Sequence, residues 1–443
     1  MDKKKIKVVL CWHMHQPHYR DGLDGVYRLP WVYLHAIKDY SDMVWHLENC
    51  PEAKVVVNFA PVLLEQLDDY EQQMRAWLGK GVAMQDPLLN LAAGLTPIPQ
   101  TAKEREEIVA VCQRAYAPTM INVLPAFREL VDMVECNMAP HRTENVCVSY
   151  LNDQYFTDLL VWYHLAWMGE SLRHSDERVD ALMDKRNHYT IEDQRILIEI
   201  IADCVGSIIP RYKALMERGQ IEISMTPYGH PIVPLLIDFK SMRDALPDAP
   251  APAYASYPDG YERSKWHMEH GLKVYQQHFD TKPKGVWLSE GAISSTAVGL
   301  LDEYGFKWTA SGEGVWRHSC EASCVDQHDY HSKKALYQPL QLASQKCAMF
   351  FRDDGLSDMV GFQYKDWHPT DAANDFAQHM ENIANFLGDR VEEHVVSVIL
   401  DGENAWEYYS YNGYYFLQAL YSRLSTHPDI ELTTFSECLK TSP

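Results

Sequence analysis

Seven short apolar runs, each ending in polar or aromatic residues, constrain the fold of this chain more than any other feature. The runs lie at 7–12, 54–59, 221–226, 285–288, 306–310, 348–352 and 395–400. Apolar residues at helical spacing occupy several of the intervals, at 31–47, 61–78, 191–216 and 376–387. Alternation of strands with helices predicts a parallel sheet and an α/β fold. Polar residues at the carboxyl ends of the strands predict a barrel with its active site on that face.

The stretch from about residue 86 to residue 203 interrupts this alternation, because its pattern is mostly helical. A chain of 443 residues is long enough to bury the core of a barrel with additions. We therefore expect residues 1–443 to form a single catalytic domain, with 86–203 as a mostly helical insertion within it.

Charge and cysteine content limit the partners and the compartment. The formal net charge of −22 argues against nucleic acid and against an anionic membrane as partners. The ten cysteines contain no Cys-x-x-Cys pair, and no signal-peptide cleavage site follows the basic N-terminus. We expect a cytoplasmic protein with reduced thiols, no membrane span and no bound cofactor.

Two carboxylates follow separate runs, each in a segment that also holds a tryptophan. Glu290 comes three residues after Trp287, and Asp401 comes five residues before Trp406. Two acids on separate strand ends, each near an aromatic ring, suit the cleavage of a glycosidic bond. Both tryptophans can alternatively be part of the barrel packing.

The first run ends in His13-Met14-His15-Gln16. Histidines at i and i+2 on a strand point to the same face. Three interpretations stay open: binding of sugar hydroxyls, which His and Gln side chains do well, simple packing, or a zinc site like that of a metal-dependent amidohydrolase. The further ligands that a zinc site needs have candidates in His230, His368 and Asp401. We expect sugar binding by His13, His15 and Gln16, and no metal.

The third run contains Glu222 and leads to Tyr228 and His230. Glu222 lies inside the strand pattern, so its burial requires a partner, either a core cation or a substrate. Tyr228 and His230 follow the strand end and are the better candidates for substrate binding. A separate group has spacing that permits a small zinc site, but it lacks a strong metal motif: His318, Cys320, Cys324, His328 and His331.

These residues together resemble glycoside hydrolase family 57, whose members act on α-glucans. The family's first motif is similar to His15-Gln16-Pro17, and its second to 219–223 with 227–231. The third is similar to Trp287-Leu288-Ser289-Glu290-Gly291, and the fourth to 401–409. The resemblance spans nearly the whole chain and is strongest to the α-amylase and amylopullulanase branch.

The resemblance implies an incomplete (β/α)7 barrel and a retaining glycosidase, with Glu290 as the nucleophile and Asp401 as the general acid/base. It also implies that His15, Glu222, Trp287 and Trp406 line the sugar subsites. Glu403 and Asn404 are positioned in the fourth motif to bind sugar hydroxyls or to hold Asp401. The expected partner is an α-glucan or a maltooligosaccharide.

Two features depart from the family pattern. Leu288 stands where the nearest branch has proline, and the helical region that usually follows the fourth motif is expected to be short or missing. Three alternatives to a glycoside hydrolase stay open: a 4-α-glucanotransferase on the same scaffold, a metal-dependent amidohydrolase- or deacetylase-like enzyme using His13 and His15, and a non-catalytic glucan-binding relative.

Overall fold

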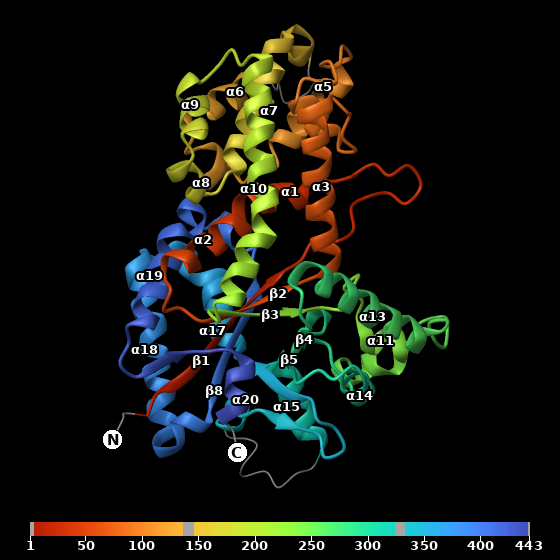
Figure 1. Ribbon diagram of the computed structural model, residues 1–443, viewed down its shortest axis with the longest axis vertical. Helices are drawn as coiled ribbons and strands as arrows, with labels where there is room; N and C mark the ends of the chain where they lie inside the picture. The colour runs from red at the N-terminus through yellow and green to blue at the C-terminus, as the bar shows by residue number, and fades with distance from the viewer. Residues whose placement is uncertain (1–3, 136–145, 324–332, 442–443) are drawn as a thin grey trace.

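The computed structural model describes residues 4–135, 146–323 and 333–441 (Figure 1). Its centre is a closed ring of parallel strands in the order β1, β2, β3, β4, β5, β7, β8 and back to β1. The strands of the ring are β1 (Ile6–Met14), β2 (Val55–Phe59), β3 (Ile221–Met225), β4 (Gly285–Trp287), β5 (Trp308–Gly312), β7 (Ala348–Arg352) and β8 (Val395–Asp401). The predicted α/β barrel is confirmed, and each of the seven predicted strands lies within two residues of its expected ends.

The first strand is the seam of the ring. Its later residues pair with β2, and its earlier residues pair with the short strand β9 (Ile430–Leu432) on the same edge. Its other edge pairs with β8 along seven positions, ending with His13 opposite Asp401. A second short strand, β6 (Leu340–Gln341), pairs antiparallel with β7. The sequence predicted neither short strand.

The strands form where they do because both of their faces are covered. All nine residues of β1 and all five of β2 are buried, which is typical of parallel strands with a packed interior and an outer layer of helices. At the amino ends of the strands, helix α20 (Phe435–Thr441) closes the barrel. The Phe435 ring lies 4.5 Å from both the Trp308 and the Phe350 ring centroids.

An outer layer of helices covers the ring (Figure 1). The longer ones are α3 (Pro61–Lys80), α10 (Ile191–Glu217), α13 (Gly260–Phe279), α14 (Ser295–Glu303), α15 (Glu313–Ala322), α18 (Pro369–Leu387) and α19 (Tyr414–Ser425). Short helices α11 (Val233–Ile237), α12 (Met242–Ala245) and α17 (Asp354–Asp358) lie in the connections. The helix predicted at 31–47 is three consecutive pieces: α1 (Trp31–His35), a π-helical turn η1 (Ala36–Tyr40) and α2 (Ser41–Asn49).

The described chain between β2 and β3 contains helices and no strand. Besides α3 and α10, these are α4 (Pro87–Ala92), α5 (Ala102–Cys112), α6 (Pro125–Glu135), α7 (Asp153–Trp167), α8 (Glu170–Ser175) and α9 (Glu177–Lys185), with the turns η2 (Ala117–Ile121) and η3 (Val146–Tyr150). They gather at one end of the molecule, at the top of Figure 1. None of the helices in the described ranges is long and apolar enough to cross a membrane.

Candidate active site

The carboxyl ends of the parallel strands bring residues from distant parts of the sequence together. Burial lowers the pKa of His13, and the charges of Asp401 and Glu290 oppose this effect. Asp401 acts in the same way on His15. Asp401 pairs with His13 in the sheet, and Glu290 follows the carboxyl end of β4, so both carboxylates stand at the same end of the barrel as His13. They come from different strands, since Asp401 ends β8 and Glu290 follows β4.

Glu290 sits in a strained turn. It belongs to the 3-10 turn η5 (Ser289–Gly291), and its φ of 57° and ψ of 17° place it in the left-handed region. Few residues other than glycine adopt this conformation, and it costs on the order of 1–3 kcal/mol. The next residue is also left-handed, and a Cβ at Gly291 would lie 2.9 Å from the Trp287 ring. The turn therefore requires glycine after Glu290, and it leaves the Glu290 side chain exposed.

Asp401 is held by a residue of its own segment, and a second carboxyl lies close behind it. Asn404 donates a hydrogen bond of 2.7 Å from Nδ2 to Asp401 Oδ2. Glu403 is buried, and its Oε1 accepts from the His15 backbone N–H at 3.1 Å and from Gln16 Nε2 at 3.3 Å. Burial, with the nearby Asp401 charge, raises the pKa of Glu403 well above its ordinary value. The protonated form is therefore favoured, and Glu403 ties the end of β8 to the end of β1.

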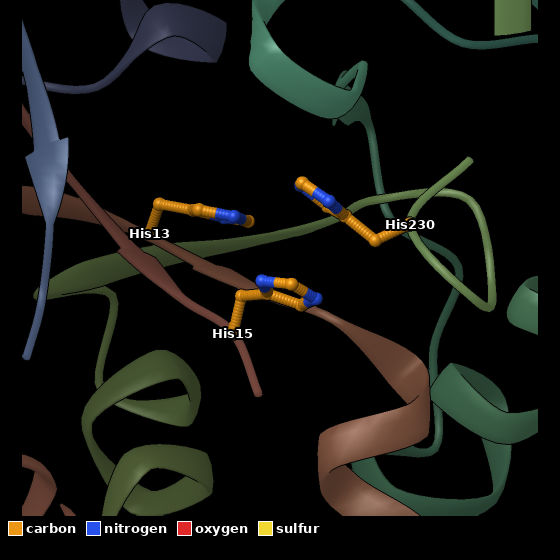
Figure 2. A group of neighbouring side chains, drawn as sticks. All are labelled: His13, His15 and His230. Atoms are coloured by element: carbon orange, nitrogen blue, oxygen red, sulfur yellow. The ribbon is translucent and has the colours of Figure 1, made fainter. Parts of the chain in front are cut away.

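Three histidines meet in this region, as Figure 2 shows. The ring centroids lie 5.5 Å apart for His13 and His15, 5.0 Å for His13 and His230, and 3.9 Å for His15 and His230. Burial lowers the pKa of His15 to about 4 and that of His230 to about 2, with the neighbouring histidines contributing. All three imidazoles are thus neutral at pH 7. His230 has a left-handed backbone, with φ of 54°.

An aromatic cluster next to His230 was not predicted from the sequence. Tyr228 donates a hydrogen bond of 2.6 Å to Glu65 Oε2, and its ring contacts two side chains of α13, Trp266 and His270. The Trp266 and His270 rings are stacked at 5.0 Å, and Trp266 is 51% exposed. Trp266 and His270 are four residues apart in a helix, so this spacing was the signal that could have identified the cluster.

Two predicted site residues serve the core instead. Glu222, near the amino end of β3, accepts hydrogen bonds from Trp308 Nε1 at 2.7 Å and from the Ser436 backbone N–H at 3.0 Å. The structure thus uses Glu222 to fix α20, at the opposite end of the barrel from Asp401. Trp406 is 1% exposed, donates to the Gly402 carbonyl and packs against Trp12, so its ring presents no face to a sugar. Both are corrections to the expected subsites.

The remaining predicted residues divide as follows. Trp287 lies in the barrel interior and is only 9% exposed. The described residues whose donor atoms are arranged to share a metal ion are His13, His15 and His230, and His368 is not among them. His318 and Cys320 lie on α15, whereas Cys324, His328 and His331 lie outside the described residues. The cysteines for which the structure gives a state are free thiols: Cys11, Cys50, Cys112, Cys204, Cys320, Cys347 and Cys438.

Comparison with solved structures supports the same architecture. An α-amylase from Thermotoga maritima superimposes with a TM-score of 0.55 at 14% identity, covering 99% of this chain and 75% of that one. A family 57-type branching enzyme from Pyrococcus horikoshii gives 0.54 at 16% identity, covering 98% and 70%. A 4-α-glucanotransferase from Thermococcus litoralis gives 0.50 at 16% identity, covering 99% of this chain and 41% of that one.

Sequence comparison identifies the family. No curated protein matches the chain. The model of glycosyl hydrolase family 57, however, matches residues 9–443, which include both strand-end carboxylates and all of the ring of strands except the first three residues of β1. The chain belongs to glycosyl hydrolase family 57.

Proposed function

We propose that this protein is a retaining glycoside hydrolase that acts on α-glucans such as starch, glycogen or maltooligosaccharides. The observation that carries the proposal is that two carboxylates stand at the carboxyl ends of two different strands of one barrel, since Asp401 ends β8 opposite His13 and Glu290 follows β4. Family membership supports the reaction class, and the likeness to an α-amylase, a branching enzyme and a 4-α-glucanotransferase supports an α-glucan as the substrate.

In this proposal Glu290 attacks the anomeric carbon while Asp401 protonates the departing glycosidic oxygen. The covalent glycosyl-enzyme is then released when Asp401, now a base, activates an acceptor hydroxyl. A retaining mechanism requires the two carboxyl groups to come within about 5–5.5 Å of each other. Asn404 holds Asp401, and Glu403 acts as a positioning residue through its bond to the His15 backbone.

Neutral imidazoles and amides surround the proposed reaction centre. His13 and His15 are suited to hydrogen bonds with sugar hydroxyls, because a neutral imidazole has a nitrogen lone pair that accepts. The buried Gln16 amide already donates to Glu403 and accepts from Tyr19 Oη, so it supports the site from behind. His230 and Tyr228 lie on the adjoining loop, and the exposed Trp266 ring beside them supplies an apolar face for a further sugar unit.

Transfer to a second glucan is the second candidate reaction. The acceptor that reaches the glycosyl-enzyme decides the outcome, since water gives hydrolysis and a sugar hydroxyl gives transglycosylation. The likeness to a glucanotransferase over 99% of this chain favours keeping this candidate. We propose amylose, pullulan and maltooligosaccharides as substrates that separate the reactions and the α-1,4 and α-1,6 linkages.

The decisive experiment compares wild type with Glu290→Gln on these substrates. We expect a loss of roughly 10³-fold or more in turnover, because the amide cannot form the glycosyl-enzyme. The control is Glu321→Gln, an exposed carboxylate on α15, which should match wild type in turnover and thermal stability. Near wild-type product release by Glu290→Gln would refute the assignment.

Azide rescue tests the two roles separately. With α-maltosyl fluoride and azide, Glu290→Gly should yield the β-glycosyl azide, because azide enters on the face that the nucleophile vacates. Asp401→Gly should yield the α-glycosyl azide, because azide then attacks the glycosyl-enzyme. The opposite anomers would exchange the two roles.

A further inference from the structure

We propose that His13, His15 and His230 form a binding site for one divalent transition-metal ion of the zinc class, inside the pocket proposed above for the sugar. The metal-binding part stands on the geometry of the three side chains alone. The second part, that metal and glucan exclude each other, rests on the proposed function.

The three side chains are nearly in place for chelation (Figure 2). One nitrogen from each ring lies within 4.8 Å of the others. Zinc–imidazole bonds of about 2.0–2.1 Å put the ligand nitrogens of a tetrahedral site roughly 3.3 Å apart. A movement of the ring nitrogens toward one another by on the order of 1 Å is therefore enough to form a tetrahedral site. Two of the three ligands follow strand ends, where side-chain rotation can supply this movement, since His15 comes after β1 and His230 after β3.

Hydrogen bonding fixes the form of His13 that a metal needs. Asn58 donates from Nδ2 to Ser224 Oγ at 2.9 Å, so its Oδ1 is the atom that faces His13 Nδ1 at 2.7 Å. His13 Nδ1 must then carry the hydrogen and donate it, which leaves the lone pair on Nε2. A metal-binding histidine is usually held in this way, by donating its other ring N–H to an oxygen behind it.

Two ring nitrogens at the centre of this group have no partner. His13 Nε2 and His230 Nε2 are buried and make no hydrogen bond within the described structure. Leaving a buried nitrogen unpaired is unfavourable, so a ligand that engages both nitrogens is favoured. His13 itself is 6% exposed, which makes this a built site and not a chance surface cluster.

The charge of the surroundings favours a cation. Two carboxylates stand at the same end of the barrel, since Asp401 pairs with His13 in the sheet and Glu290 follows the end of β4. Imidazole ligands select zinc, copper and nickel over magnesium and calcium.

A metal and a glucan that use the same histidines would exclude each other. A metal bound to His13 and His15 uses the lone pairs that would otherwise accept hydrogen bonds from sugar hydroxyls. Micromolar zinc should therefore inhibit glucan turnover competitively, and a chelator should leave the turnover of metal-free protein unchanged.

The test is a titration of the metal-free full-length protein with Zn²⁺ and Co²⁺ against a chromophoric chelator. We expect one equivalent bound, with Co²⁺ giving visible d–d bands and no thiolate charge-transfer band, because the ligands are imidazoles. His15→Asn and His230→Asn should each weaken binding at least tenfold; asparagine at 230 tolerates the left-handed backbone. His379→Asn, a half-exposed histidine on α18, is the matched control and should bind like wild type.

Circular dichroism and thermal melting verify that each variant is folded, and Asn58→Ala provides a variant that leaves all three ligands intact. We expect Asn58→Ala to lose about tenfold in zinc affinity, the usual effect of removing the oxygen behind a ligand. Three results would overturn the site: wild type binds no equivalent of zinc, both His variants still bind it as tightly as wild type, or the cobalt form shows a thiolate charge-transfer band. Zinc affinity unchanged by saturating maltoheptaose would overturn the shared pocket, whereas failure of metal-free protein to cleave glucan would count against the proposed function alone.

Discussion

Backbone strain marks two of the proposed site residues. Glu290 and His230 come from different loops, yet both adopt the left-handed conformation that most side chains avoid. Such strain persists only where the surrounding structure fixes it, and it is concentrated at functional sites. Here the turn at Glu290 is supported by Ser311 Oγ, which donates to the Gly291 carbonyl at 2.6 Å. The strain thus directs a carboxylate and an imidazole toward the carboxyl end of the barrel.

At the same scale, buried neutral histidines make the fold sensitive to acid. His46 on α2 is 2% exposed, and burial lowers its pKa to about 3. In the unfolded chain His46 takes up a proton below about pH 6.5, whereas in the folded chain it does so only near pH 3. The stability that its neutral form contributes is therefore complete above pH 6.5 and is lost as the pH falls.

Because leucine cannot be protonated, we expect the free energy of unfolding of His46→Leu to fall by about 2 kcal/mol less than that of wild type between pH 7 and pH 5. Urea unfolding at the two pH values measures the difference. His379→Leu, the half-exposed control, should follow wild type. Parallel losses in wild type and His46→Leu would show that His46 is protonated in the folded state.

Residue type identified which side chains are candidates for catalysis or binding, but it did not show which residues they contact in the fold. A glutamate inside a strand and a tryptophan near an acid have the same appearance in the sequence whether they face the pocket or the core. The Ser436 backbone N–H that binds Glu222 lies 214 positions along the chain, and the rings that enclose Trp406 come from β1 and α19. Local pattern cannot contain such contacts. Only the placement of Glu290 and Asp401 at one end of the barrel could be predicted, because Glu290 follows a recognisable strand and Asp401 ends one.

At the scale of elements, the strands were predictable because parallel strands with both faces buried require continuous apolar runs. The two missed strands, β6 and β9, contain two and three residues, too few for a pattern. The break of the 31–47 helix at the π-helical turn Ala36–Tyr40 also left no signal, because all of its residues are buried and the turn is set by packing.

The end of α3 allows a clean test of backbone conformation. Gly81 caps the helix with φ of 67° and has no atom within 4 Å of an added Cβ, whereas Gly79, inside the same helix, is equally open. Gly81→Ala should lower the free energy of unfolding by about 1 kcal/mol, because only the left-handed backbone opposes it. Gly79→Ala should raise it by roughly 0.5–1 kcal/mol. Thermal or urea unfolding of the two variants measures both changes in the free energy of unfolding. Equal changes in the two variants would contradict the role of Gly81 as the helix cap.

Helix α20 should contribute much of the stability of the barrel. Phe435 is fully buried against Trp308 and Phe350, so Phe435→Ala should cost about 3–5 kcal/mol in urea unfolding. Lys440→Ala, on the exposed face of the same helix, should change stability by less than about 0.5 kcal/mol. Glucan turnover by the folded Phe435→Ala fraction should persist, because the candidate site lies at the other end of the strands. A loss below 1 kcal/mol would show that α20 is dispensable.

On the scale of the whole molecule, the helical region contacts the segment that carries Asp401. Thr119, in the turn η2, donates a hydrogen bond to the Glu407 carbonyl, and the Tyr116 and Tyr408 rings meet at 4.8 Å. We propose that residues 86–203 form an insertion within one catalytic domain and that this contact steadies the loop after β8.

Thr119→Val keeps the shape of the side chain but removes the donor. We expect it to lower kcat/KM on maltooligosaccharides about fivefold, the effect of losing roughly 1 kcal/mol of loop stabilisation, with little change in thermal stability. Thr157→Val is the matched control, because Thr157 donates only to the Asp153 carbonyl of its own helix. Equal kcat/KM in both variants would show that the helical region does not influence the loop.

The pairing of β1 also has a consequence for how the protein is made. Among the strands of the ring this one is synthesised first, yet its partners β8 and β9 are synthesised after every other strand of the ring. Pairing over such sequence distances is slow, and an unpaired strand edge invites association with other chains. A nascent chain interrupted before β8 would have an open edge and an uncovered apolar interior. Interrupted synthesis should therefore produce a client for chaperones and proteases, not a smaller working enzyme.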